Sequence, residues 1–115
     1  MRYILMNYLN EATWSAQTPA QRAEGAAAYK AFVEALTTAG AYVGSQGLSA
    51  PSQATTVRIS NGKTQVMDGP YADTKEQLGG IFTIEVPDLD AAISWAARCP
   101  AASLGVVELR AAWGA

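Results

Sequence analysis

The chain has 115 residues, of which half are apolar and 16% are charged, and its formal net charge is −2. This length and composition predict one soluble globular domain over residues 1–115. With no excess of basic residues to neutralise a run of phosphates, and no polybasic segment, we expect neither a nucleic-acid partner nor a membrane partner. Histidine is absent, which removes the commonest general base and the commonest metal ligand.

Cysteine usage and the absence of targeting patterns suggest a location. Cys99 is the only cysteine, so no intramolecular disulfide can form and a reducing, cytoplasmic environment is expected. The first residues lack the pattern of a signal peptide, and no apolar stretch is long enough to span a bilayer. The sequence contains neither a metal-ligand set nor a glycine-rich phosphate motif, so no metal or cofactor is expected.

The first half of the chain predicts a strand, a loop and a long helix. Residues 2–9 form an apolar run on both faces, which is typical of a strand buried on both sides. Residues 10–18 are predicted to be a loop. Thr18-Pro19-Ala20-Gln21 matches a capping box with proline at the first helical position. The helix should end at Gly40, and its apolar stripe is Tyr29, Phe32, Val33 and Leu36.

The second half predicts strands, a hairpin and a second helix. Residues 41–48 read as a short strand, and residues 55–60 and 63–67 as a hairpin closed by Asn61-Gly62. That turn places Val57 opposite Val66, Ile59 opposite Thr64 and Arg58 opposite Gln65. Residues 68–80 are predicted to be a loop with one helical turn at 74–78. A strand at 81–86, a helix capped by Asp88 and ended by Pro100, and a strand at 106–110 complete the chain.

This order of elements indicates a ferredoxin-like α+β fold, an antiparallel sheet with two helices on one face. The other face should then be exposed to solvent, yet the first strand is apolar on both sides. A second copy of the chain, packed sheet against sheet, would cover that face and make a homodimer. The alternative is that Ile4 or Met6 packs under the long loop.

The turn Asp68-Gly69-Pro70-Tyr71 is the first candidate for a functional site. Gly69 permits unusual backbone angles and Pro70 restricts them, so Asp68 sits on a stiffened backbone. A carboxylate held in this way could act as a general base or anchor a ligand. The alternative is that Asp68 accepts hydrogen bonds from the amides of its own turn.

Tyr71, Lys75 and Glu76 follow Asp68 within the same loop. Two acids, a cation and a phenol in nine residues could hold a small polar molecule. The same residues could also form a solvated face with weak local ion pairs.

Arg58 and Tyr8 are further candidates for ligand binding. Arg58 lies in the middle of a strand, where a charge needs a partner or a pocket. Alternation puts it on the face opposite Asp68, and Gln65 across the hairpin is its alternative partner. Tyr8, near the end of the first strand, could present its hydroxyl to a ligand or pack in a core or interface.

The segment from Asp68-Gly69-Pro70-Tyr71 to Gly80 resembles the YCII-related proteins of the DGPF subgroup, with Tyr71 where that subgroup has phenylalanine. The likeness extends over nearly the whole chain, including residues 3–6 and the region around Trp95. It implies a ferredoxin-like fold that pairs into a dimeric α/β barrel. It also implies a bacterial cytoplasmic protein, often encoded near an extracytoplasmic-function sigma factor.

The resemblance also bears on chemistry. Some YCII-type members carry a histidine and an aspartate in a cleft, and many relatives have histidine near the position of Gly25. His-Asp chemistry therefore does not carry over to this chain, and Asp68 carries over as a motif residue only.

Two functions remain open. The first is a dimer with a small-molecule pocket near the Asp68 loop, acting as a cofactor-independent enzyme of proton-abstraction or elimination type. Asp68 would then be the base or anchor, with Tyr8, Arg58 and Tyr71 orienting the ligand. The second is a non-catalytic ligand-binding or regulatory protein, linked to a sigma factor.

Overall fold

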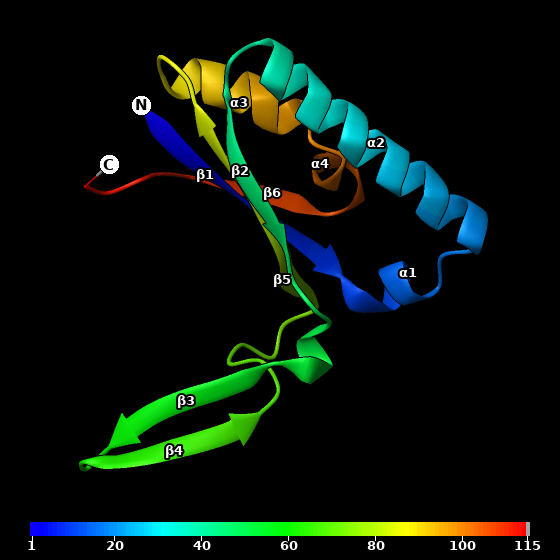
Figure 1. Ribbon diagram of the computed structural model, residues 1–115. Coiled ribbons are helices and arrows are strands. Elements are labelled where there is room, and N and C mark those ends of the chain that lie inside the picture. Colours follow the sequence, from blue (N-terminus) through cyan, green and yellow to red (C-terminus); the bar gives the residue numbers. More distant parts are fainter. Residues whose placement is uncertain (115) are drawn as a thin grey trace.

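A computed structural model describes residues 1–114, which form an α+β protein (Figure 1). A four-stranded antiparallel sheet carries the helices, and a separate two-stranded hairpin projects away from it. The elements in chain order are β1 (Arg2–Asn10), α1 (Glu11–Ser15), α2 (Pro19–Thr38), β2 (Tyr42–Gly47), the 3₁₀ turn η1 (Pro51–Gln53), β3 (Thr55–Ser60), β4 (Lys63–Asp68), β5 (Glu76–Glu85), α3 (Leu89–Arg98), α4 (Ala101–Leu104) and β6 (Val106–Ala111).

The four strands of the main sheet lie in the order β2-β5-β1-β6, and every neighbouring pair is antiparallel. β1 is central, between β5 and β6. Helices α2 and α3 lie on the same side of this sheet (Figure 1). This arrangement is compatible with the ferredoxin-like layout that the order of elements predicts.

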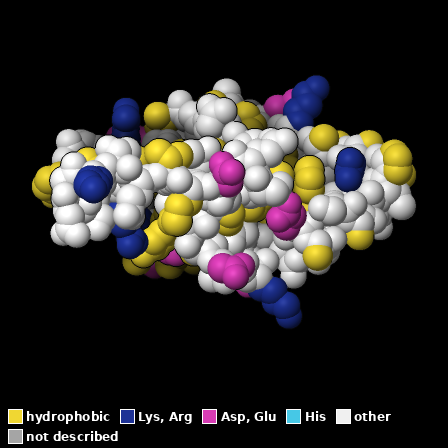
Figure 2. Space-filling model, turned by 90° about the horizontal axis from the view of Figure 1, so that it is seen from below, with side chains coloured by type: hydrophobic (Ala, Val, Ile, Leu, Met, Phe, Trp, Pro, Cys, Tyr) yellow, Lys and Arg dark blue, Asp and Glu magenta, His cyan; other side chains and the backbone are white. Residues whose placement is uncertain are grey.

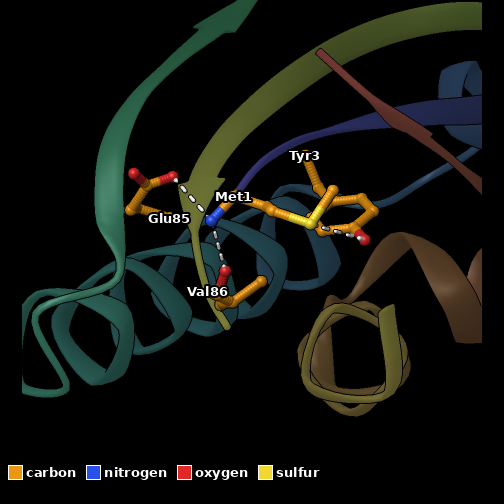
Figure 3. Close-up of polar contacts among 4 residues, drawn as sticks. All are labelled: Met1, Tyr3, Glu85 and Val86. Carbon is orange, nitrogen blue, oxygen red and sulfur yellow. Dashed lines mark hydrogen bonds and ion pairs between the residues drawn. The ribbon is translucent and has the colours of Figure 1, made fainter. Parts of the chain in front are cut away.

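The start of β1 is tied to the end of β5 (Figure 3). The nitrogen of Met1 donates to the carbonyl oxygen of Val86 at 2.8 Å and lies 3.6 Å from the Glu85 carboxylate. The Tyr3 hydroxyl lies 4.0 Å from the sulfur of Met1. Because both charged partners are exposed, this ion pair adds little stability. The register of the two strands is set by the backbone pairing of β1 with β5.

The predicted helix caps are confirmed. The Gln21 amide donates to Thr18 Oγ1 at 3.1 Å, and the Thr18 amide donates to Gln21 Oε1 at 2.9 Å, which completes a capping box at the start of α2. α3 begins in the same way, with the Ala91 amide donating to Asp88 Oδ1 at 2.9 Å. Side chains near these ends therefore satisfy amides that have no partner within the helix.

The core lies between the helices and one face of the sheet. Phe32 of α2 packs edge-on against Phe82 of β5, with ring centroids 5.2 Å apart. Along β1, only alternate residues reach this core, because successive side chains of a strand point to opposite faces. The buried apolar side chains are Tyr3, Leu5, Phe32, Leu36, Ala41, Phe82, Ile84, Val86, Ala92, Ala96, Cys99 and Ala101.

Two local predictions for the loops are wrong. Residues 10–18 include the short helix α1, whose first turn is capped by Asn10 at 3.0 Å from the Ala12 amide. Residues 74–78 form no helical turn, because β5 already begins at Glu76. The backbone is extended there because the start of β5 pairs with the end of β1, with Glu76 opposite Asn10 and Leu78 opposite Tyr8.

The predicted hairpin forms with the predicted register, but it does not join the main sheet. Val57 faces Val66, Arg58 faces Gln65 and Ile59 faces Thr64. Asn61 and Gly62 both have positive φ, 52° and 74°, as the tight turn requires. β3 and β4 form a sheet of their own, so the expectation of a single sheet is wrong. Figure 1 shows this hairpin projecting on the side away from the helices.

The second face of the main sheet differs from the first. Tyr3, Leu5 and Asn7 of β1 are buried under the helices, whereas the alternating side chains between and beyond them are only partly buried. Those side chains point to the side opposite α2 and α3. We call this surface the open face; its residues on the central strands are Ile4, Met6, Tyr8, Ile81 and Thr83.

Candidate functional site

Asp68 ends β4 and pairs with Thr55 across the hairpin. The backbone that follows is held firmly, because the Gly69 amide donates to the Ala54 carbonyl oxygen at 2.7 Å and Thr56 Oγ1 donates to the Gly69 carbonyl oxygen at 2.8 Å. Gly69 has φ 97°, a region that favours glycine. The stiff backbone predicted at this turn is therefore present, although the hairpin and not the Asp68 side chain holds it.

The Asp68 carboxylate itself is exposed, and within residues 1–114 it accepts no hydrogen bond from a neighbouring amide. The alternative in which it caps its own turn is not what the structure shows. The carboxylate is thus free to meet a ligand or a partner, but the single chain alone does not shelter it from water.

Arg58 and Tyr71 are brought together. The Arg58 guanidinium lies over the Tyr71 ring, 5.6 Å from its centroid. Such a contact at an exposed site contributes about 0.5–1 kcal/mol. Since Thr55 faces Asp68, strand alternation places Arg58 on the opposite face of the hairpin from Asp68, as predicted.

The other predicted ligand-binding residues are more dispersed. Lys75 precedes β5, and Glu76 is its first residue, opposite Asn10; both side chains are exposed. Tyr8 is part of the open face, between Leu78 and Val106 on the adjacent strands. No hydrogen bond or ion pair in the described part of the chain joins Tyr8, Lys75 or Glu76 to Asp68.

Three cavities that the sequence did not predict meet around Leu9 and Trp14, where β1 ends and α1 begins. Their volumes are about 380, 290 and 140 Å³. Trp14 is half exposed, and the Arg22 guanidinium stacks over its ring at 5.2 Å from the centroid. Trp14 is not among the site residues that the sequence predicts, and its segment was predicted to be a loop.

The 380 Å³ cavity, which we call the helix-side cavity, lies between α2 and the strands β1, β2 and β5. Asn7, only 3% exposed, is among its lining residues. Asn7 was already conspicuous in the sequence as the one polar residue inside an apolar strand, and that signal could have located the cavity.

Two acidic groups near Asn7, the buried thiol of Cys99 and the hydroxyl of the partly buried Tyr29, are neutral at ordinary pH. The Cys99 thiol lies 3.7 Å from Asn7 Oδ1, and burial raises the pKa of this thiol. Burial also raises the pKa of the Tyr29 hydroxyl to about 12. Hence the thiol donates to Asn7 Oδ1, and Tyr29 offers a protonated hydroxyl. This environment suits neutral hydrogen bonding and does not activate a nucleophile.

Gly25, the position where the resemblance implies histidine in relatives, lines a wide groove of about 1240 Å³ beside the first half of α2. A Cβ at Gly25 would meet nothing within 4 Å, so packing does not require glycine there. The groove is open, and most of the first half of α2 is exposed.

The sequence of this α+β protein matches a protein-family model over nearly its whole length. The model of the YCII-related domain matches residues 1–113, and the chain belongs to that family. The chain is also similar to an uncharacterized protein of Rhizobium meliloti (strain 1021), with 54% identity over 43 residues, which is 37% of this chain. The match spans 35% of the length of that relative. None of the described helices is long and apolar enough to cross a membrane.

Proposed function

We propose that this YCII-related protein, a DGPF-type member of the family, works in the cytoplasm as a homodimer whose open faces pack together into a dimeric α/β barrel. The observation that carries the proposal is the open face itself. Ile4 and Met6 of β1 lie beside Thr83 and Ile81 of β5 on a surface that neither α2 nor α3 covers. Apolar side chains in the middle of a sheet are stabilised when a second layer removes them from water.

The projecting hairpin supports the same assembly. Val57, Ile59 and Val66 lie on one face of it and are 61%, 72% and 63% exposed. Figure 2, seen from the hairpin side, shows hydrophobic side chains scattered among polar and charged ones on the near surface. A two-stranded hairpin with an apolar face is marginal in water, so a partner that receives this face would stabilise the hairpin.

The dimer would also complete a small-molecule pocket near the Asp68 loop. Asp68, Lys75 and Glu76 are exposed in the single chain, and a second copy would supply the walls that exclude water from them. Arg58 and Tyr71 are in contact, and Arg58 lies on the other face of the hairpin from Asp68, so this pair would orient the part of the ligand that extends past the edge of the hairpin, together with Tyr8 of the open face. In an enzyme, Asp68 would take a proton from the substrate in an abstraction or elimination that needs no metal.

A non-catalytic ligand-binding or regulatory role, linked to a sigma factor, is the second candidate. The observation in its favour is that Asp68 is exposed and lacks an imidazole partner, since the chain contains no histidine. Without such a partner a carboxylate can still bind a ligand, so ligand binding requires fewer groups at this site than catalysis does.

A ligand screen by thermal shift tests the pocket on the wild type and on Asp68→Asn, with Asp73→Asn as the matched control in the same loop. A ligand of this pocket should raise the melting temperature of the wild type and of Asp73→Asn, but not of Asp68→Asn. Equal stabilisation of all three proteins would place the ligand elsewhere. Incubation of the ligand with the wild type then separates the two functions, because only an enzyme converts it.

A further inference from the structure

The helix-side cavity has a polar floor that the chain leaves incompletely bonded. Asn7 is almost fully buried, and its Oδ1 accepts from the Cys99 thiol. Its Nδ2 group donates no hydrogen bond to another residue of the described chain. Yet no side-chain nitrogen or oxygen sealed from solvent in residues 1–114 lacks a partner. The Nδ2 group is therefore not sealed from solvent, and the helix-side cavity is the space that Asn7 lines.

The orientation of the Asn7 amide follows from its neighbour. The Cys99 thiol donates to Asn7 Oδ1, so Nδ2 is the atom of this amide that is left for another partner. Leaving a buried amide donor unpaired is costly unless water or a ligand accepts from it. The cavity thus presents a fixed donor to whatever occupies it.

The charge on the lining of the helix-side cavity is positive only. Lys30 is the only charged residue that lines it, and no Asp or Glu does. Within residues 1–114, Lys30 forms no ion pair. The walls are largely apolar and aromatic, and Tyr29 stacks on Phe82 with an interplanar angle of 10°. A lone cation at the rim of such a space favours an anion with an apolar body.

We propose that the helix-side cavity binds a small organic carboxylate, whose carboxylate pairs with Lys30 and whose apolar body lies against Trp14, Tyr29 and Phe82. The Asn7 amide donates to an acceptor oxygen of the same ligand. The volume of about 380 Å³ falls at the lower end of the range for small-molecule sites, so the ligand is compact. This site lies on the helix side of the sheet, and no residue of a second copy is needed to complete it.

The test uses phenylacetate as the probe and phenylacetamide as its neutral isostere, with side-chain amide and indole signals followed by NMR. Phenylacetate should shift the Asn7 amide and Trp14 indole signals saturably, with millimolar affinity. Phenylacetamide, and phenylacetate on Lys30→Gln, should bind roughly fivefold more weakly, because each loses the ion pair. Lys63→Gln removes another exposed lysine, from the hairpin, and should bind as the wild type does.

A second set of variants probes the interior. Val33→Phe fills the cavity and should abolish the shifts, whereas Asn7→Leu should weaken binding. Val33→Phe keeps the test decisive if Asn7→Leu does not fold. The proposal is overturned if phenylacetate causes no saturable shift, or if the amide binds equally well. It is also overturned if Lys63→Gln weakens binding as much as Lys30→Gln, or if the shifts map to the hairpin. Binding should persist in a monomeric open-face variant, so its failure and a failure of the proposed dimer are distinguishable.

Discussion

The two faces of the main sheet are built from the same strands and meet different surroundings. On the helix side, Leu5 and Ile84 are completely buried. On the open face, Met6 and Ile81, which sit opposite each other, remain only partly buried. The strands supply apolar side chains to both faces, but the chain's own helices cover one. In the proposed dimer, a second copy of the chain would cover the apolar side chains of the open face.

Truncating one side chain on each face of the sheet should distinguish the core contact from the proposed partner contact. The truncation on the helix side should have the largest effect. Leu5→Ala should lower the free energy of unfolding by about 3 kcal/mol, because it leaves a cavity in the core. That loss should be the same at low and high protein concentration in urea denaturation.

The neighbouring variant Met6→Ala is the matched probe of the open face. Its loss should be small at low protein concentration and should grow where dimers form, because the proposed partner would bury Met6. If Met6→Ala is as costly as Leu5→Ala at every concentration, the open face is already packed within one chain.

Gly25→Ala tests how loosely the first half of α2 is attached. A Cβ there meets nothing within 4 Å, and alanine favours a helix interior over glycine by about 1 kcal/mol. The free energy of unfolding should therefore rise by up to that amount in urea titrations. As a contrast, Gly105→Ala should be strongly destabilising, because its Cβ would overlap the carbonyl of Tyr8. A destabilised Gly25→Ala would mean that something packs on this half of the helix.

The pH dependence on the helix side should be the smallest effect. The folded pKa of Tyr29 is raised to about 12 from 10, so the stability that its neutral hydroxyl provides is complete below pH 10. It should be lost as the pH rises from about 10 to 12. The Cys99 thiol, whose pKa burial also raises, acts in the same direction above pH 9. The melting temperature should fall less steeply with pH in Tyr29→Phe; an unchanged slope would contradict the burial of this hydroxyl.

The sequence predicted most elements of the fold, because their signals are local. The capping box at Thr18 and the Asn61-Gly62 turn each determine a short segment with few long-range contacts. The start of β5 was missed because it depends on pairing with the distant end of β1, where Glu76 lies opposite Asn10. The register of β3 and β4 can likewise be predicted from the turn that joins them. Their separation from the main sheet depends on how distant parts of the chain pack, so no local pattern reveals it.

The candidate site was less accessible to prediction. The contact of Arg58 with Tyr71 joins a strand to a loop, and no spacing rule foresees it. The helix-side cavity draws residues from β1, α1, α2, β2 and β5, so only the folded chain brings them together. Of the residues that line this cavity, only Asn7 could be noticed in the sequence, as a polar residue inside an apolar strand.

Sedimentation velocity of the wild type and of Met6→Lys at micromolar concentration tests the central claim most directly. The account predicts a dimeric wild type and a folded, monomeric Met6→Lys, because a lysine on the open face would place a charge between two apolar sheets. Ala27→Lys, which adds the same charge on the exposed side of α2, should remain dimeric. A wild type that sediments as a monomer would contradict the account.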